Sequence, residues 1–249
     1  MRRIGAELRA AFQLLTRLPV PSTTCSPERL GGVAKFFPLV GVVIGGCGAV
    51  LHIVAEKVLP ASISALLVLT FLVLITGGFH EDALADAADG FGGGWNRERV
   101  LEIMRDSRIG SYGGIAIGLS LLWRYILLAT LPDARFTSYF VAAHVLCRWT
   151  SLPLSYALKP ARTDGSGATV AQRTSKGGLA LGSIFTLAVT LACLKSAAWL
   201  PVLATLVAVL VSGWYYKRRL GGVTGDCFGA TNQISEIAVY FCGCAFANG

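Results

Sequence analysis

The sequence predicts an all-α, polytopic integral membrane protein: a bundle of about seven transmembrane helices with an N-terminal amphipathic interfacial helix. Composition is the first sign, because 54% of the 249 residues are hydrophobic, only 14% are charged, and the mean hydropathy is +0.62. Soluble domains carry about 25% charged residues. The second sign is a series of apolar stretches, each long enough to cross a hydrocarbon core about 30 Å thick. We expect a single membrane domain over 1–249.

The first element expected is an amphipathic helix over 2–18. Its apolar residues recur every three or four positions, at Ile4, Leu8, Ala11, Phe12 and Leu15. Arginines occupy other positions, so one face is apolar and the other is basic. Such a helix lies in the plane of the membrane interface. The stretch 19–21 ends it, because its two prolines lack the N–H that a continuing helix needs.

Seven apolar spans follow the amphipathic helix. We place them at 36–58, 61–79, 111–131, 136–157, 178–197, 199–216 and 231–248. Pro60 and Pro201 mark tight breaks between neighbouring spans. The last span is short and begins with polar residues. The cysteines are scattered without a metal-binding spacing, and we expect them to be reduced apolar residues.

The positions of the basic residues give these spans an orientation. With the N-terminus in the cytoplasm and the spans alternating, 17 of the 22 Lys and Arg residues lie on the cytoplasmic side. This bias is expected of a multi-pass protein of the bacterial inner membrane. The same orientation puts the polar segments 80–110, 158–177 and 217–230 on the cytoplasmic face. Loops that act on one ligand must share a side, so the site is expected there. Membrane lipid surrounds such a chain, and no nucleic-acid partner is expected.

The most informative segment, 80–110, begins with a cluster of acids. Asp82, Asp86 and Asp89 are spaced four and three residues apart, so they share a stripe about 60° wide on a helix. Like charges at this spacing repel one another. A divalent cation offsets that repulsion, and Mg²⁺ or Mn²⁺ prefers hard oxygen ligands completed by water and substrate phosphate. The stripe therefore predicts a metal site, with a solvated acidic turn as the plain alternative.

The stretch 104–113 predicts phosphate contacts. Arg105 and Arg108 would share a face if the stretch is helical, and paired guanidinium groups bind phosphate through two parallel hydrogen bonds. Asp106 would join the metal or fix an arginine. Ser111 and the neighbouring glycines leave backbone N–H groups at the start of the next helix, which is an anion site. A basic loop that flanks the membrane is the alternative.

A third polar segment, 221–236, adds candidates. Asp226 is a candidate metal ligand or general base. Asn232 and Glu236 lie four residues apart at the start of a span, hence on one face of a helix. A carboxylate at that depth is costly unless it faces the protein interior or a wet cavity. The alternative for Glu236 is a boundary residue that reaches water.

Two arginines and the three histidines, all within or beside the apolar spans, each have an expected role. Arg148 stands in mid-span with His144 one turn before it, and a charge at that depth is a functional candidate. Arg124 lies nearer the far end of its span between two aromatic residues, and we interpret it as a snorkelling interfacial residue. His80 directly precedes the acids and is a candidate contact to phosphate or to the metal's surroundings. His52 is expected to be structural.

Five stretches, in this order, make the sequence recognisable. They are LTRLPVP at 15–21, FPLVG at 37–41, GGFHEDALADAADG at 77–90, MRDSRIG at 104–110 and GGVTGD at 221–226. They are distributed over nearly the whole chain. With these stretches the chain resembles the cobalamin synthase family, whose members are adenosylcobinamide-GDP ribazoletransferases. One departure is Ala83, where the family often has glycine, and it lies between the proposed ligands rather than at one.

This resemblance implies an integral membrane enzyme that uses Mg²⁺. Such an enzyme would join adenosylcobinamide-GDP to α-ribazole, or to α-ribazole 5′-phosphate, and release GMP. The ribazole 5′-hydroxyl would attack the phosphorus nearest cobinamide. The GDP-linked substrate would supply the pyrophosphate that an aspartate-rich metal site binds.

The expected roles of the residues follow from this reaction. The metal ligands are Asp82, Asp86 and Asp89. The residues expected to contact substrate or phosphate are His80, Arg105, Asp106, Arg108, Ser111, Arg148 and Asn232. The catalytic carboxylates are Glu81, Asp82, Asp86, Asp226 and Glu236, and the hydroxyl proton would pass to Asp226, Glu81 or Glu236.

Other membrane proteins also carry acid clusters. A CDP-alcohol phosphotransferase would show Asp-Gly-x-x-Ala-Arg, and a prenyl transferase would show a second aspartate-rich motif; neither is seen in this sequence. A corrinoid or ion transporter would show internal repeats and polar groups near mid-membrane in both halves, whereas these acids cluster at one face. Homo-oligomer formation and association with other enzymes of cobalamin synthesis stay open.

Overall fold

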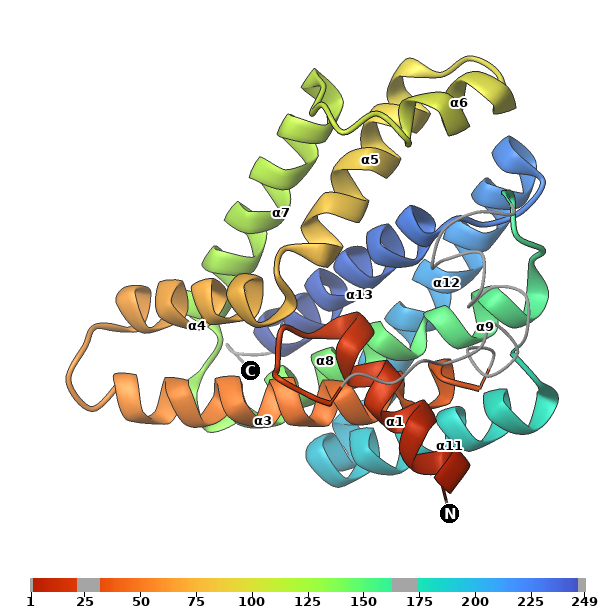
Figure 1. Ribbon diagram of the computed structural model, residues 1–249. Helices are drawn as coiled ribbons and strands as arrows, with labels where there is room; N and C mark the ends of the chain where they lie inside the picture. The colour runs from red at the N-terminus through yellow and green to blue at the C-terminus, as the bar shows by residue number, and fades with distance from the viewer. Residues whose placement is uncertain (1, 22–31, 163–173, 246–249) are drawn as a thin grey trace.

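The computed structural model describes residues 2–21, 32–162 and 174–245. These residues form helices joined by short connections (Figure 1). The α-helices are α1 (Arg2–Leu15), α3 (Phe37–Ala55), α4 (Ala61–Thr76), α5 (Phe79–Gly93), α6 (Arg97–Ile103), α7 (Ser111–Thr130), α8 (Asp133–Trp149), α9 (Ser151–Ala157), α11 (Lys176–Leu194), α12 (Trp199–Leu220) and α13 (Gly225–Ala245). Two 3-10 turns, η1 (Ala34–Phe36) and η2 (Lys195–Ala198), precede α3 and α12. The all-α prediction is confirmed for the described residues.

The predicted amphipathic helix is α1, which ends at Leu15 rather than at 18. The Thr16 hydroxyl donates to the Phe12 carbonyl at 2.7 Å and satisfies an acceptor that the ending helix leaves free. The apolar face packs on the bundle through Leu15. Glu7 of the same helix is buried and pairs with Lys35 at 2.8 Å. The helix is therefore anchored to the rest of the protein by an ion pair as well as by apolar packing.

Glycines on α3 let this helix approach α8 closely. A Cβ at Gly41 would collide with the backbone carbonyl of His144. A Cβ at Gly45 would come within 3.0 Å of the Val141 backbone. Small residues spaced four apart are the usual means of bringing helices together in membranes. The α3–α8 pair is therefore fixed by the absence of side chains at its contact.

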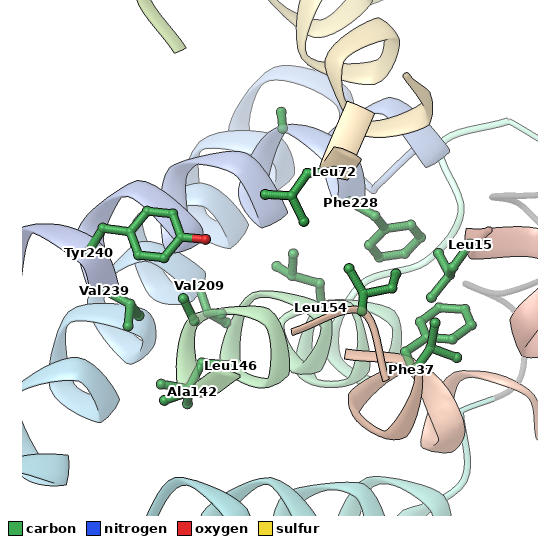
Figure 2. Packing of buried hydrophobic residues seen from close by; sticks show 14 of the residues in the cluster. Leu15, Phe37, Leu72, Ala142, Leu146, Leu154, Val209, Phe228, Val239 and Tyr240 are labelled. Atoms are coloured by element: carbon green, nitrogen blue, oxygen red, sulfur yellow. The ribbon is translucent and has the colours of Figure 1, made fainter. Parts of the chain in front are cut away.

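Helix α13 packs against α5, α7, α8 and α12, so it lies at the centre of the bundle. Figure 2 shows one part of the core, where Val239 of α13, Val209 of α12 and Leu146 of α8 come together. A second part lies where Phe228 of α13 approaches Phe37 of α3. Because α13 contacts α5 along one side, the C-terminal polar segment is held beside the acidic helix.

A sharp bend separates α4 from α5. Gly77 and Gly78 both have positive φ angles, 68° and 70°, which favour glycine. The two helices meet at 84°. The predicted span 61–79 therefore ends at Thr76, and the acidic helix leaves in a new direction, towards the upper part of Figure 1.

Helices cover most of the described residues of every predicted span, but fewer spans qualify as membrane-crossing by length and hydropathy. Residues 246–248 of the last predicted span lie outside the described residues. In the described residues three stretches do, Ala34–Ala55, Ser111–Thr130 and Lys176–Leu220, and α4 with α5 would make a fourth as a broken span. The third stretch comprises two helices, α11 and α12. The predicted span 136–157 is broken at Thr150, and the predicted span 231–248 belongs to the longer, more polar α13. The polytopic membrane bundle is confirmed, whereas these criteria support fewer than seven spans.

Large apolar side chains on the outer helices stay exposed. They include Ile115 on α7, Ile184 and Leu191 on α11, and Leu210 on α12. A soluble protein rarely exposes such continuous apolar surface. This exposed apolar surface is suited to contact with the lipid chains of a membrane.

Candidate functional site

The polar segments that are distant in the sequence lie together at one end of the bundle. Arg97 donates to the carbonyl oxygens of Leu220 at 2.9 Å and Ala161 at 2.7 Å. Arg219 donates to the Gly94 carbonyl at 2.6 Å. These bonds tie the acidic segment to the other two, as the expectation of a shared side requires.

The carboxylates of Asp82 and Asp86 lie one turn apart on α5. Neither has a hydrogen bond or an ion pair within the described residues. Asp82 is exposed and Asp86 is half-buried. Asp226 of α13 and Arg162 lie within electrostatic range of the Asp86 carboxylate. Two like charges thus face a third carboxylate across the contact between α5 and α13.

This donor set fits a small, hard cation. Mg²⁺ is usually held by one or two carboxylates, and water and substrate phosphate complete its coordination. Asp82 and Asp86 have no other partner and are free to serve as those two ligands. In the part of the chain that the structure describes, no three acids of this group bring their ligand atoms within 4.8 Å of one another. The geometry therefore suits an ion shared between protein and substrate rather than one enclosed by protein.

Asp226 is held in a fixed position beside the two free acids. Its Oδ2 accepts hydrogen bonds from the Thr224 hydroxyl at 3.2 Å and from Arg162 at 3.3 Å. Burial raises the pKa of Asp226; Arg162 and Thr224 oppose that rise, and the Asp82 charge adds to it. A carboxylate whose pKa is shifted upward towards neutral pH is suited to accept a proton.

Asp89, the third acid of the stripe, has a different environment. Its Oδ2 accepts from the Gly110 N–H at 2.7 Å, and its Oδ1 accepts from the Gly113 N–H at 2.8 Å. A Cβ at either glycine would collide with this carboxylate. The predicted anion site at the start of α7 therefore exists, but its anion is Asp89 of the same chain. These N–H groups are not free for phosphate, and Ser111 beside them is exposed.

The stretch 104–110 does not continue the helix. Helix α6 ends at Ile103, so the stretch is not helical and the condition for Arg105 and Arg108 to share a helix face is not met. Arg108 instead donates to Asp106 Oδ2 at 2.6 Å, and this pairing lowers the pKa of Asp106 to about 2. Asp106 thus fixes an arginine, the second of its two predicted roles. The Arg108 side chain is 87% exposed, so it faces the solvent from which a substrate arrives.

Arg124 is buried inside the bundle, so its interpretation as a snorkelling residue is wrong. The side chain is 1% exposed, with Nη2 at 2.6 Å from Glu81 Oε1 and Nη1 at 3.6 Å from Glu236 Oε1. Gln233 donates to the same Glu81 oxygen at 3.3 Å. Its counter-charges come from α5 and α13, which are distant in the sequence. Glu81 and Glu236 therefore face the protein interior, where they act as counter-ions to one arginine.

His80, Arg148 and Asn232, all predicted to bind substrate, line one cavity. The cavity lies among α1, α3, α5, α8, α9 and α13, and three phenylalanines form part of its wall. Two polar atoms there, Arg148 Nε and Asn232 Oδ1, have no hydrogen-bond partner among the described residues. The Arg148 Nη1 atom donates to the His144 carbonyl at 3.1 Å, which fixes the guanidinium. Two residues that line the cavity thus carry an unsatisfied donor and an unsatisfied acceptor, both buried away from solvent.

Sequence reasoning missed three residues of this site. Arg162 was not singled out as a site residue, although it pairs with Asp226. Thr224 and Gln233 carry no charge and so drew no attention, although both donate to carboxylates. The one available signal was position, because all three lie in or next to polar segments on the predicted side.

Comparisons with known proteins identify the family. The model of the cobalamin-5-phosphate synthase family matches residues 7–244. The chain belongs to the cobalamin-5-phosphate synthase family. The match includes every candidate residue described above, and it confirms the resemblance drawn from the five sequence stretches. No solved structure matches the chain.

Curated members of the family cover almost the full length of the chain. A protein named adenosylcobinamide-GDP ribazoletransferase from Ralstonia nicotianae is 38% identical, over 96% of this chain and 95% of its own length. One of the same name from Polaromonas sp. is 39% identical, over 92% and 93% of the two chains. Another from Vibrio cholerae is 38% identical, over 95% and 92%. The chain is therefore similar to these enzymes throughout and not in one domain only.

Proposed function

We propose that this family member uses Mg²⁺, held by Asp82 and Asp86, to join adenosylcobinamide-GDP to α-ribazole or its 5′-phosphate. The joining reaction follows from the family and from the names of its relatives. The metal and the residue roles are the proposal, and the unpartnered carboxylate pair on α5 carries it. Mg²⁺ bound there would neutralise the pyrophosphate and the departing GMP.

Asp226 is the residue we assign as proton acceptor. Of the three carboxylates considered for this role, Glu81 and Glu236 are engaged with the buried Arg124. Asp226 lies within electrostatic range of Asp86, and its raised pKa suits removal of a proton from the ribazole 5′-hydroxyl. Arg162 and Thr224 hold the carboxylate in place while the hydroxyl attacks the phosphorus nearest cobinamide.

The cavity beside the acids would receive part of the substrate. Gly225 lines it next to Asp226, and His80 lines it two residues before Asp82. Its volume is about 40 Å³, so it would take a small polar group of the substrate and not an aromatic ring. Arg148 and Asn232 present the unsatisfied donor and acceptor that would orient a polar group of that ligand.

The same proposal places Arg105 and Arg108 on the solvent side of the site. Both side chains are exposed, and both would contact phosphate oxygens of the GDP-linked substrate. The positive-inside bias supports a bacterial inner-membrane location with these residues and the N-terminus in the cytoplasm.

A test uses the full chain purified in detergent with adenosylcobinamide-GDP and α-ribazole. We expect Mg²⁺-dependent release of GMP, which chelation of the metal abolishes and added Mg²⁺ restores. Asp82→Asn and Asp86→Asn should lose this release while the protein stays folded. Glu98→Gln is a matched control, because Glu98 is an exposed acid on the neighbouring helix α6.

Two outcomes would overturn parts of this proposal. Full turnover in a chelator, or in both aspartate variants, would remove the metal assignment. Absence of GMP release by the wild-type chain with every substrate present would remove the reaction itself.

A further inference from the structure

A second group of potential metal ligands lies away from the acidic segment. His52 near the end of α3, Glu56 directly after that helix and Asp133 at the start of α8 place three ligand atoms within 4.8 Å of one another. The group lies by the α3–α4 turn, at the left of Figure 1, whereas the acidic segment lies on α5 and beyond. Neither the proposed reaction nor the substrate cavity uses these residues.

His52 is buried and held in one orientation. The residue is 3% exposed, and its ring stacks on Phe136 with centroids 3.3 Å apart and planes 10° apart. Its Nδ1 lies 2.9 Å from the hydroxyl oxygen of the buried Ser64. A metal-ligating imidazole characteristically donates its other N–H to a neighbour, which fixes its tautomer. Ser64 is placed to accept that proton, which leaves the lone pair on Nε2.

The contact between His52 and Glu56 has the geometry of two ligands rather than that of a hydrogen bond. Nε2 lies 2.9 Å from Glu56 Oε1, yet Nε2 makes no hydrogen bond among the described residues. Two atoms that each bind one ion at about 2.1 Å are about 3 Å apart at an octahedral angle and about 3.4 Å apart at a tetrahedral one. The separation of 2.9 Å is close to the first of these values.

Asp133 completes the group from another helix. One of its carboxylate oxygens lies within 4.8 Å of the ligand atoms of His52 and Glu56. Two negative charges this close repel each other, and a divalent cation bound between them would neutralise both carboxylates.

We infer that His52, Glu56 and Asp133 bind a divalent cation of the Zn²⁺ or Mn²⁺ class, with water completing its coordination. One imidazole with two carboxylates suits these ions, whereas Mg²⁺ takes oxygen ligands. The bound ion ties the end of α3 to the start of α8, and Ser64 adds α4 through the imidazole. Its effect is therefore on the stability of the bundle and not on turnover.

The test is Zn²⁺ titration of the purified full chain in detergent, with excess Mg²⁺ present to occupy the acidic segment. We expect calorimetry to detect a site that Asp133→Asn and Glu56→Gln weaken by at least tenfold, since losing an outer partner alone costs about 10- to 100-fold. Zn²⁺ should raise the melting temperature of the wild-type chain and not that of the two variants. Both substitutions preserve side-chain shape, and GMP release at the wild-type rate would confirm that the variants fold.

Two controls separate this site from other sites that bind zinc. Glu98→Gln removes an exposed carboxylate elsewhere and should leave Zn²⁺ binding unchanged. Ser64→Ala keeps all three ligands and should weaken binding about tenfold, through the tautomer of His52. Equal Zn²⁺ affinity in the wild type and both ligand variants would assign the ion to cysteines or to the acidic segment and overturn the inference. Absence of binding to the wild type would also overturn it.

Discussion

Helix α5 carries two kinds of carboxylate, and their surroundings differ completely. Glu81 is buried against Arg124 of α7, and Asp89 accepts two backbone N–H groups at the start of the same helix. Asp82 and Asp86, on the same helix and within eight residues, have no partner in the described part of the chain. The sequence shows four similar acids, whereas the structure shows two that have hydrogen-bond partners and two that have none among the described residues.

This difference distinguishes acids that stabilise the fold from acids that are available to bind a ligand. A satisfied carboxylate stabilises the fold, because its hydrogen bonds are made when the protein folds. An unsatisfied pair of like charges costs stability until a cation or substrate arrives. Folded proteins keep such a cost mainly where function needs it. The comparison supports the proposed binding of a ligand by Asp82 and Asp86, whereas the partners of Glu81 and Asp89 link α5 to α7.

The largest effect is expected when one acid of the unpartnered pair is neutralised, and it tests whether this pair acts in turnover rather than in stability. Asp86→Asn should lower the GMP-release rate by about 10²–10³-fold, the cost of removing one strong electrostatic contact from a transition state. The same change should leave the melting temperature unchanged or slightly higher, because one like-charge repulsion of about 0.2–0.5 kcal/mol disappears. Turnover assays and thermal melts of one preparation measure both effects. A fall in both quantities would mean that Asp86 stabilises the fold, and the comparison would fail.

The second largest effect is expected where Arg124 pairs with the buried carboxylates. Arg124→Met should destabilise the protein by about 3–5 kcal/mol, because it leaves buried carboxylates without a counter-charge. Both Glu81 and Glu236 contact this arginine from other helices. Thermal melts in detergent measure the loss, and the triple variant with Glu81→Gln and Glu236→Gln should recover most of it. A triple variant no more stable than Arg124→Met would show that the arginine acts through packing rather than charge.

Part of this division could be read from the sequence, and part could not. The spacing of the aspartates predicted that they lie on one helix, as they do on α5. The charge distribution predicted that the polar segments lie together, and Arg97 joins two of them. The partner of each acid is not local. Arg124 lies 43 residues after Glu81, and only the packing of α7 on α5 shows that the two meet.

The bend at Gly77 and Gly78 is a local feature, but the sequence prediction did not include it. The predicted span 61–79 rested on continuous apolar residues, and hydropathy does not register the direction of a helix. Two glycines with positive φ turn the chain by 84° between α4 and α5. Adjacent glycines signal such a turn, because other residues seldom adopt that conformation.

A smaller effect is expected at Asp89, which is predicted as a metal ligand and whose two oxygens accept backbone N–H groups. Asp89→Asn should destabilise the protein by about 1–2 kcal/mol, the usual cost of losing a helix cap, because an amide oxygen can replace only one of two acceptors. The dependence of GMP release on Mg²⁺ concentration should stay at its wild-type value. A shift to higher Mg²⁺, as expected for Asp86→Asn, would return Asp89 to the group of metal ligands.

The smallest effect is expected at Arg108, outside the helix altogether. Its side chain is 87% exposed and is paired only with its neighbour Asp106 in the described residues. Arg108→Ala should raise the KM for adenosylcobinamide-GDP about threefold at low salt, the size expected of a solvent-exposed charge contact, and less at high salt. The kcat and the melting temperature should not change. Arg99→Ala is the matched control, because Arg99 is exposed on α6 and paired with Glu102. A loss in kcat instead would place Arg108 on the transferring phosphoryl group and extend the reactive surface beyond α5 into 104–110.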